Sequence, residues 1–453
     1  MKWGGQMTVQ ENRADLKAKD QKYLWHAMSG TASDPARLVV KKAEGAWITD
    51  IDGRRYLDGM AGLWCVNAGY GRKELADAAY EQLLEMPYAP LTNTHVPAVR
   101  LAEKLNEWLG GDYVIFFSNS GSEANETAFK IARQYHQQKG EHARYKFISR
   151  YRAYHGNTMG ALGATGQAQR KYKYEPLGQG FIHVQPPDLY RNPADRDTLE
   201  SAEDIDKVMM WELPETVAGV IMEPIITGGG ILMPPDGYMA KVKDICEKNG
   251  ALLICDEVIC GFGRTGERFG FMNYGVKPDI ITMAKGMTSG YLPLAATAVK
   301  REIYEAYAGD GPYDRFRHVN TFGGSPAACA LAIKNLSIME EERLIERSRV
   351  LGERLLSELK EMEDRPKVGN VRGKGLLVGV ELVKDKQTKE PADLADVNKV
   401  IGECRQKGLI VSKNADTAAG YNNVIQLAPP LSLTEEDLSF IIGVLKESLC
   451  RLA

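Results

Sequence analysis

Short apolar runs of strand length alternate with longer mixed segments through the middle of the chain. The longer segments include residues 122–139 and 236–249, which mix polar and apolar residues as a surface helix does. Because parallel strands need a crossover of helix length between them, the alternation predicts an α/β fold with a mostly parallel sheet covered by helices. The expected strands are residues 113–118, 145–150, 219–224, 251–257, 279–285 and 294–299.

The two ends of the chain have a different pattern. Near the start, GAWITDIDGRRYLDG is typical of a hairpin that turns at Asp52–Gly53. The tail predicts a charged helix over 340–362, a strand in GLLVGVEL and a helix from about 393. We therefore expect a large domain at 71–335 and a smaller α+β domain built from 1–70 and 336–453.

Composition excludes several classes of partner. The 57 basic and 60 acidic residues give a net charge of -3 without long basic runs, so a nucleic-acid partner is not expected. No apolar stretch is long enough to span a bilayer, and the start lacks the apolar core of a secretion signal. Seven scattered cysteines without a CxxC pair favour neither disulfides nor a metal site. We expect a cytoplasmic protein without membrane contact or bound metal.

The segment LLICDEVICGFGRTG ends a buried strand on Asp256 and Glu257 and then spells GxGxxG. A dinucleotide site would need a helix to open on these glycines, but ERFGFMNYG follows them and has little helical periodicity. Two carboxylates beneath a diphosphate would also repel it. An aspartate at the carboxyl end of a strand can instead hold the ring nitrogen of a pyridine cofactor, although a helix cap is the simpler alternative.

The next expected strand, in PDIITMAKGMTSG, ends in Lys285. A lysine within an otherwise apolar and small-residue stretch is disfavoured unless its amine is used. Formation of a Schiff base with an aldehyde is such a use.

Two further strand ends carry candidate cofactor contacts. In FFSNSGSEANETAFKIARQYH the backbone N–H groups of Gly121 and Ser122 would face an anion at a helix N-terminus, although this is also a common way for a helix to start. Tyr154 and His155 follow the expected strand at 145–150, and an aromatic ring there either stacks on a cofactor or packs in the core.

Taken together, these residues resemble the class III pyridoxal-phosphate-dependent aminotransferases of fold type I. The likeness extends from YLWH at 23–26 to LAPPLSLTEED at 427–437. Six motifs fall in the family's order: SNSGSEANE, YHG, MEP, CDEVICGFGRTG, TMAKGMTSGYLP and TFGGSP.

The resemblance implies catalytic roles for two residues. Lys285 would bind the aldehyde of pyridoxal phosphate and then move the substrate proton, and Asp256 would pair with the pyridine nitrogen. Glu223 of the MEP motif would lie near the cofactor and orient neighbouring side chains. The glycines of GxGxxG would form a loop of this fold.

The resemblance also implies the remaining cofactor contacts. Val258 and Tyr154 would pack on the two faces of the ring, and Gly121 and Ser122 would bind the phosphate. Thr321 would reach the same phosphate from a second subunit, which makes a homodimer, or a dimer of dimers, the expected assembly.

Within the family, MAGLWCVNAGYGR and RYRAYHGNT look most like the taurine:pyruvate and ω-amino acid:pyruvate aminotransferases. These enzymes move the amino group of a primary amine onto pyruvate or a similar 2-oxo acid. Trp64 and Tyr23 would form walls of the substrate pocket, although a buried tryptophan is a core residue about as often.

The alternative function is the adenosylmethionine-8-amino-7-oxononanoate aminotransferase of biotin synthesis. That group usually has an aspartate after YHG and an arginine before the PP motif, whereas this chain has Asn157 and no arginine in 409–430. Many amine:pyruvate enzymes also bind the keto-acid carboxylate with that arginine. We therefore expect Arg152, two residues before Tyr154, to bind the substrate's acid group, with an ordinary ion pair as the alternative.

Overall fold

The computed structural model describes residues 13–30, 37–192, 197–414, 417 and 420–452. A seven-stranded sheet forms its centre, with strand order β4-β10-β9-β8-β7-β5-β6. Strand β10 pairs antiparallel with both β4 and β9, and each pair of neighbouring strands from β9 to β6 is parallel. The strands are β4 Tyr113–Ser118, β5 Lys146–Arg150, β6 Phe181–Val184, β7 Val217–Met222, β8 Leu252–Asp256, β9 Ile280–Met283 and β10 Ala295–Lys300.

The six expected strands are therefore present, and the mostly parallel sheet is confirmed. Strand β6 was not among the expected strands, because Phe181–Val184 is a four-residue strand at the sheet edge and only Val184 is buried. A strand this short gives little periodic signal.

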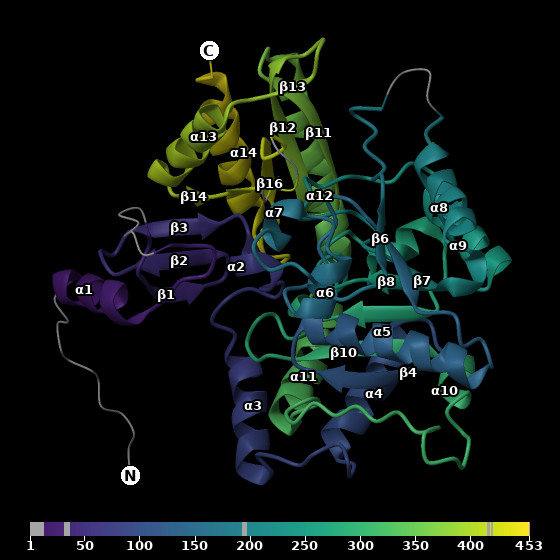
Figure 1. Cartoon of the computed structure of the whole chain (residues 1–453). Coiled ribbons are helices and arrows are strands. Elements are labelled where there is room, and N and C mark those ends of the chain that lie inside the picture. The colour runs from purple at the N-terminus through teal and green to yellow at the C-terminus, as the bar shows by residue number, and fades with distance from the viewer. Residues whose placement is uncertain (1–12, 31–36, 193–196, 415–416, 418–419, 453) are drawn as a thin grey trace.

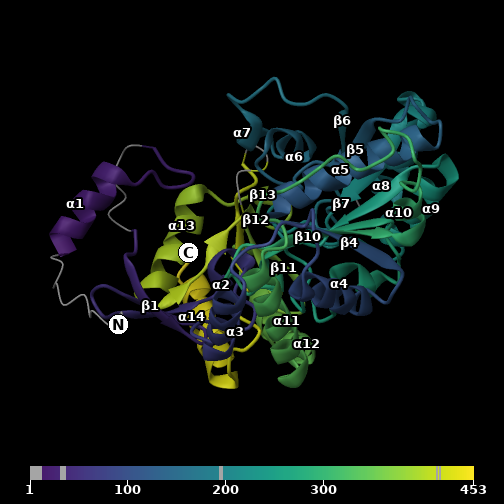
Figure 2. The same ribbon diagram turned by 90° about the horizontal axis from the view of Figure 1, so that it is seen from below.

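Helices cover the sheet (Figures 1 and 2). Helix α5 packs across β4, β10, β9, β8 and β7, whereas α8 contacts β6 and α9 contacts β8. Every residue of β7 and β8 is buried, as expected for central strands with covered faces. The helices are α3 Lys73–Glu85, α4 Val96–Trp108, α5 Gly121–Gln138, α6 Met159–Ala164, α7 Ala168–Lys171, α8 Glu200–Trp211, α9 Tyr238–Asn249, α10 Arg301–Glu305 and α11 Pro326–Glu341, with short 3-10 turns at Pro214–Thr216, Gly270–Tyr274 and Lys285–Met287.

The two ends of the chain meet in one sheet of order β1-β2-β3-β14. Strand β3 pairs antiparallel with β2, which confirms the hairpin around Asp52–Gly53, and pairs parallel with β14 from the tail. The N-terminal elements are α1 Arg13–Tyr23, β1 Val40–Glu44, β2 Trp47–Asp50, β3 Arg55–Asp58 and α2 Ala61–Trp64. The C-terminal elements are α12 Leu344–Lys360, a 3-10 turn at Glu361–Asp364, β11 Val368–Lys374, β12 Leu377–Asp385, β13 Glu390–Pro391, α13 Leu394–Gln406, β14 Leu409–Ile410, β15 Ser412–Lys413, β16 Val424–Leu427 and α14 Glu435–Cys450.

Strands β11, β12, β16 and β15 form a further sheet, with β13 paired to β12. The residue limits of the two domains stay a prediction.

None of the helices in the described ranges is long and apolar enough to cross a membrane. Within the same ranges, His, Cys, Asp and Glu side chains form no group of three that could hold a metal ion.

Candidate active site

The carboxyl ends of β7, β8 and β9 border a cavity of about 470 Å³. Its walls also include the start of α5 and the loop after β5. The cavity brings together seven of the residues to which the sequence assigns cofactor contacts: Gly121, Ser122, Tyr154, Glu223, Asp256, Val258 and Lys285.

Three hydrogen bonds hold the Asp256 carboxylate at the end of β8. Its Oδ2 accepts from Asn125 Nδ2 at 2.8 Å and from His155 Nδ1 at 2.9 Å, and its Oδ1 accepts from the Val258 backbone N–H at 3.1 Å. The side chain is buried, so these bonds fix its orientation in a site from which water is largely excluded.

Sequence reasoning assigned no role to Asn125, and it did not connect His155 with Asp256. Asn125 lies one helical turn after Gly121 on α5, and this spacing, inside the SNSGSEANE motif, was the available signal. Besides Asp256, the Asn125 side chain binds the His155 carbonyl at 2.6 Å and the Thr282 hydroxyl at 2.7 Å. The asparagine therefore connects α5, β9 and the loop after β5.

Lys285 lies two residues after the end of β9 and lines the cavity. Its φ of 45° lies in the left-handed region, a conformation that costs free energy for a residue with a side chain. The ammonium lies 5.4 Å from the centre of the Trp64 ring. Burial lowers the pKa of Lys285, partly offset by Cys65, Asp256 and Glu223. A lower pKa increases the fraction of neutral, nucleophilic amine.

Glu223 holds two loops at the cavity. One carboxylate oxygen accepts the Tyr154 N–H at 3.1 Å, and the other accepts the Thr227 N–H at 3.0 Å and its hydroxyl at 2.6 Å. Burial raises the pKa of Glu223.

The N-terminus of α5 forms a tight cradle. A Cβ on Gly121 would lie 2.8 Å from the Val258 side chain, and one on Gly156, which has a φ of +140°, would lie 2.6 Å from Ser122 Oγ. Only glycines leave this space open. The first N–H groups of an 18-residue helix face it, which suits an anionic group.

Glu257, the second carboxylate of LLICDEVICGFGRTG, is not among the residues that line the Lys285 cavity. Its oxygens accept the N–H groups of Gly270 at 2.8 Å and Phe271 at 2.7 Å, at the start of a 3-10 turn. No α-helix opens on the GxGxxG glycines, since residues 258–269 form turns and bends, and the arrangement lacks the helix that a dinucleotide site requires.

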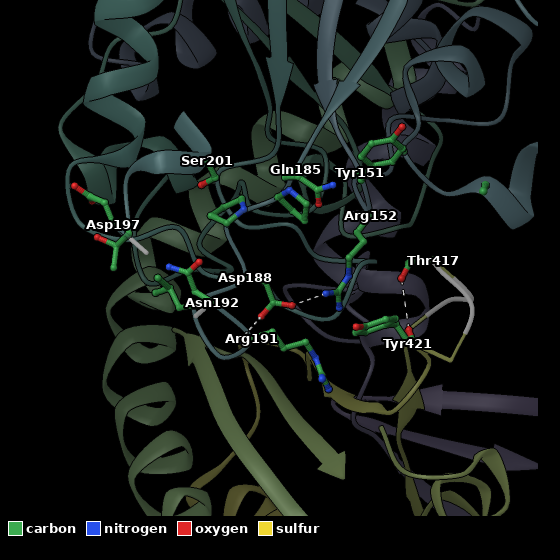
Figure 3. A pocket seen from close by; sticks show the side chains of 16 residues that line it. Tyr151, Arg152, Gln185, Asp188, Arg191, Asn192, Asp197, Ser201, Thr417 and Tyr421 are labelled. Carbon is green, nitrogen blue, oxygen red and sulfur yellow. Dashed lines mark hydrogen bonds and ion pairs between the residues drawn. The ribbon is translucent and has the colours of Figure 1, made fainter. Parts of the chain in front are cut away.

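Arg152 borders a second cavity, of about 610 Å³, rather than the one that contains Lys285. Its guanidinium binds Asp188 at 2.6 Å and the Gly229 carbonyl, and it lies 5.3 Å from the centre of the Tyr421 ring (Figure 3). This is the ion pair that was the alternative to substrate binding. A substrate anion would have to compete with Asp188 for Arg152.

Three other predicted contacts are not among the residues that form the walls of the Lys285 cavity. Trp64 is partly buried beside Lys285. Tyr23, at the end of α1, is 74% exposed. Thr321 is exposed, and its carbonyl accepts a hydrogen bond from the Tyr88 hydroxyl at 2.9 Å.

The family described as aminotransferase class III matches residues 28–449. The chain belongs to the class III aminotransferases. An uncharacterized aminotransferase of Bacillus subtilis is 75% identical over 99% of both chains. A taurine–pyruvate aminotransferase of Bilophila wadsworthia is 42% identical over 95% of this chain and 96% of its own. A putrescine–pyruvate aminotransferase of Pseudomonas aeruginosa is 37% identical over 91% and 90%.

Solved structures of aminotransferases share the fold. A Bacillus anthracis aminotransferase superposes with a TM-score of 0.95 at 63% identity, covering 97% of this chain and 98% of that one. An amine transaminase of an uncultivated Pseudomonas species, in its PLP-bound form, gives a TM-score of 0.90 at 36% identity over 95% and 99%. The class III aminotransferase described here is thus of fold type I.

The cavity of this aminotransferase fits pyridoxal phosphate, the cofactor of its family. The cradle at the start of α5 suits the phosphate, because added side chains would fill it. The buried Asp256 suits a protonated pyridine nitrogen, and Lys285 supplies the amine for the aldehyde.

Proposed function

We propose that this aminotransferase moves the amino group of a primary amine or ω-amino acid, such as taurine or β-alanine, to pyruvate or a similar 2-oxo acid. The observation that carries the reaction type is the single cavity that joins Lys285, Asp256 and the N-terminus of α5. The taurine–pyruvate and putrescine–pyruvate relatives support pyruvate as the acceptor.

The bound cofactor supplies an electron sink for the electron pair left on the substrate carbon when its proton is removed. Asp256, held by Asn125 and His155, keeps a negative charge where the pyridine nitrogen binds. Lys285 Nζ takes the proton from the substrate carbon and returns it, a role that its lowered pKa favours. Glu223 keeps the Tyr154 loop in place, so that the ring stays in the cavity wall.

On the substrate side, Trp64, Tyr23 and Arg152 remain proposed contacts. Trp64 is supported by its position beside the Lys285 ammonium. The adenosylmethionine-dependent alternative is weakened by Asn157 and by the lack of arginine in 409–430. Asn157 instead exchanges hydrogen bonds with Ser122 Oγ at 2.9 and 3.1 Å.

We also propose that the enzyme is a homodimer or a dimer of dimers in the cytoplasm, with Thr321 contacting the partner's cofactor phosphate. Exposed apolar side chains surround Thr321 and support an interface there: Tyr88, Leu91, Val319 and Phe322. The Tyr88 and Phe322 rings lie 5.9 Å apart at 64°, which gives this surface a defined aromatic contact.

A half-reaction screen tests the proposed reaction. The cofactor-loaded enzyme is mixed with one amine at a time, and the visible absorbance of the cofactor is followed. Donors should convert the spectrum, and pyruvate should then restore it with formation of alanine. The proposal is wrong if no primary amine converts the spectrum, or if converted enzyme is not restored by any 2-oxo acid.

A further inference from the structure

A second arginine, Arg170 on α7, lies beside the tyrosine in the wall of the active-site cavity. Its guanidinium carbon is 4.8 Å from the centre of the Tyr154 ring. Arg170 is half-buried. Sequence reasoning did not single it out, because a short helix rich in polar residues carries no signal of its own.

The charge of Arg170 has no counter-ion within the described ranges, where no carboxylate oxygen comes within 4.0 Å of it. Its Nε donates to Gln167 Oε1 at 2.7 Å, and one terminal nitrogen approaches Met28 Sδ at 3.8 Å. Arg152 differs, because Asp188 neutralises it at 2.6 Å. Arg170 is therefore the arginine that keeps both charge and N–H donors for a ligand.

The position of Arg170 is fixed by its neighbours. Gln167 is fully buried, and its Nε2 donates to the Arg152 carbonyl at 2.9 Å, which directs its Oε1 toward Arg170. Gly228 borders both Gln167 and Tyr154, since an added Cβ would lie 3.5 Å from Gln167 Nε2 and 3.8 Å from Tyr154 Cβ. Gln167, Tyr154 and the glycine loop after β7 thus hold the guanidinium against the Tyr154 ring, which itself lines the cavity.

We propose that Arg170 binds the acid group of the substrates and selects donors that carry a carboxylate or sulfonate over diamines. The inference rests on the proposed function and narrows its substrate class. A guanidinium offers paired N–H donors that match the oxygens of both anions. The same charge repels the second ammonium of a diamine, which separates taurine from putrescine as a donor.

The test compares Arg170→Gln and Arg170→Lys with the wild-type holoenzyme and a matched control, Lys173→Gln. Lys173 carries the same charge three residues away, and its ammonium contacts the Tyr172 ring at 5.7 Å instead of Tyr154. The donors are taurine, β-alanine, putrescine and butylamine. Arg170→Gln should lower kcat/KM for taurine and β-alanine by on the order of tenfold to a hundredfold, mainly through KM, as expected for one lost charge-assisted contact.

In Arg170→Gln, kcat/KM for butylamine should stay within about twofold of the wild-type value, because butylamine carries no acid group. The ratio of kcat/KM for putrescine to that for taurine should rise in Arg170→Gln. In Arg170→Lys, kcat/KM for the acidic donors should lie between the wild-type and Arg170→Gln values, because lysine keeps the charge without the paired donors. Lys173→Gln should match the wild type with all four donors.

A binding measurement gives a readout that does not depend on turnover. Propane-1-sulfonate has the acid group but no amine, and calorimetry with the holoenzyme should detect its binding in the wild type, a weaker signal in Arg170→Lys and none in Arg170→Gln. Equal losses for all four donors with sulfonate binding intact would overturn the inference, because Arg170 would then only support Tyr154. If no amine reacts with the wild type, the proposed function fails, and sulfonate binding still decides the role of Arg170.

Discussion

At the scale of single residues, Asp256 and Lys285 depend on neighbours from distant parts of the chain. Asn125 comes from α5 and His155 from the loop after β5, and both donate to the same Asp256 oxygen. Trp64, from the N-terminal part, covers the Lys285 ammonium. The chemistry of each group therefore depends on contacts with segments that are distant in the sequence.

Lys285→Ala should abolish sustained turnover and the visible absorbance of the covalently bound cofactor. The substitution removes the amine that binds the aldehyde and moves the proton. The alanine keeps the Cβ and the backbone at φ 45°, and only the amine and its carbon stem are removed, so the fold should persist. Visible absorption spectra, circular dichroism and alanine formation measure the three effects, and normal activity would contradict the assignment of Lys285.

Asp256→Asn should leave the cofactor bound but slow proton removal from the substrate by roughly a hundredfold or more, since about 2.7 kcal/mol of charge stabilisation corresponds to that factor. The amide cannot hold the pyridine nitrogen protonated. Single-turnover kinetics with a deuterated donor measure this step. A variant that reacts at the parental rate would show that Asp256 has another role.

At the scale of elements, the site lies where strands end and helices begin. Strands β7, β8 and β9 deliver Glu223, Asp256 and Lys285 to one edge of the sheet, and α5 starts at the same edge. Parallel strands place their carboxyl ends together, which is why residues far apart in sequence converge. The antiparallel β10 separates β9 from β4, and its pairing could not be read from its apolar pattern.

Glu257 connects β8 to the 3-10 turn at Gly270–Tyr274, and it gives a test of stability against pH. Burial raises the pKa of Glu257 from 4.5 to about 8, while the Gly270 and Phe271 N–H groups act in the opposite direction. Because the folded state then keeps a proton that the unfolded state loses, stability should fall between about pH 4.5 and 8, by at most about 1.4 kcal/mol per pH unit.

A glutamine side chain cannot titrate in this pH range. The thermal unfolding midpoint of the Glu257→Gln enzyme should therefore fall less than that of the wild type between pH 5 and about 8.5. Both holoenzymes are measured in the same buffers, which cancels the pH dependence of cofactor binding. Parallel curves would mean that the two backbone donors keep Glu257 ionised throughout.

At the scale of the whole molecule, β3 from the start of the chain and β14 from its tail share one sheet (Figure 1). The loop after β3 continues to Trp64 beside Lys285, so the junction of the two ends also positions a wall of the active site. Thr321 does not line the cavity of its own chain. In the proposed dimer it would instead contribute to the partner's active site.

Mixing inactive Lys285→Ala subunits with Thr321→Ala subunits should restore activity if Thr321 acts on the partner's site. Each hybrid dimer would then contain one intact site, and random pairing would give about a quarter of the wild-type sites. Cofactor affinity and turnover are measured before and after exchange of subunits, with each variant alone as the control. If Thr321 acts within its own chain, no hybrid site is intact and no gain appears.

The sequence by itself determined the six expected strands, the hairpin at Asp52–Gly53 and the placement of Asp256 and Lys285 at strand ends. These features follow from periodicity and turn residues, which act between neighbours along the chain. Tertiary structure decided the strand order, the short edge strand β6, the Asn125–Asp256–His155 contacts and the difference between Arg152 and Arg170. Whether an arginine forms an ion pair with an aspartate depends on packing between segments that are distant in the sequence. Local sequence patterns therefore cannot predict it.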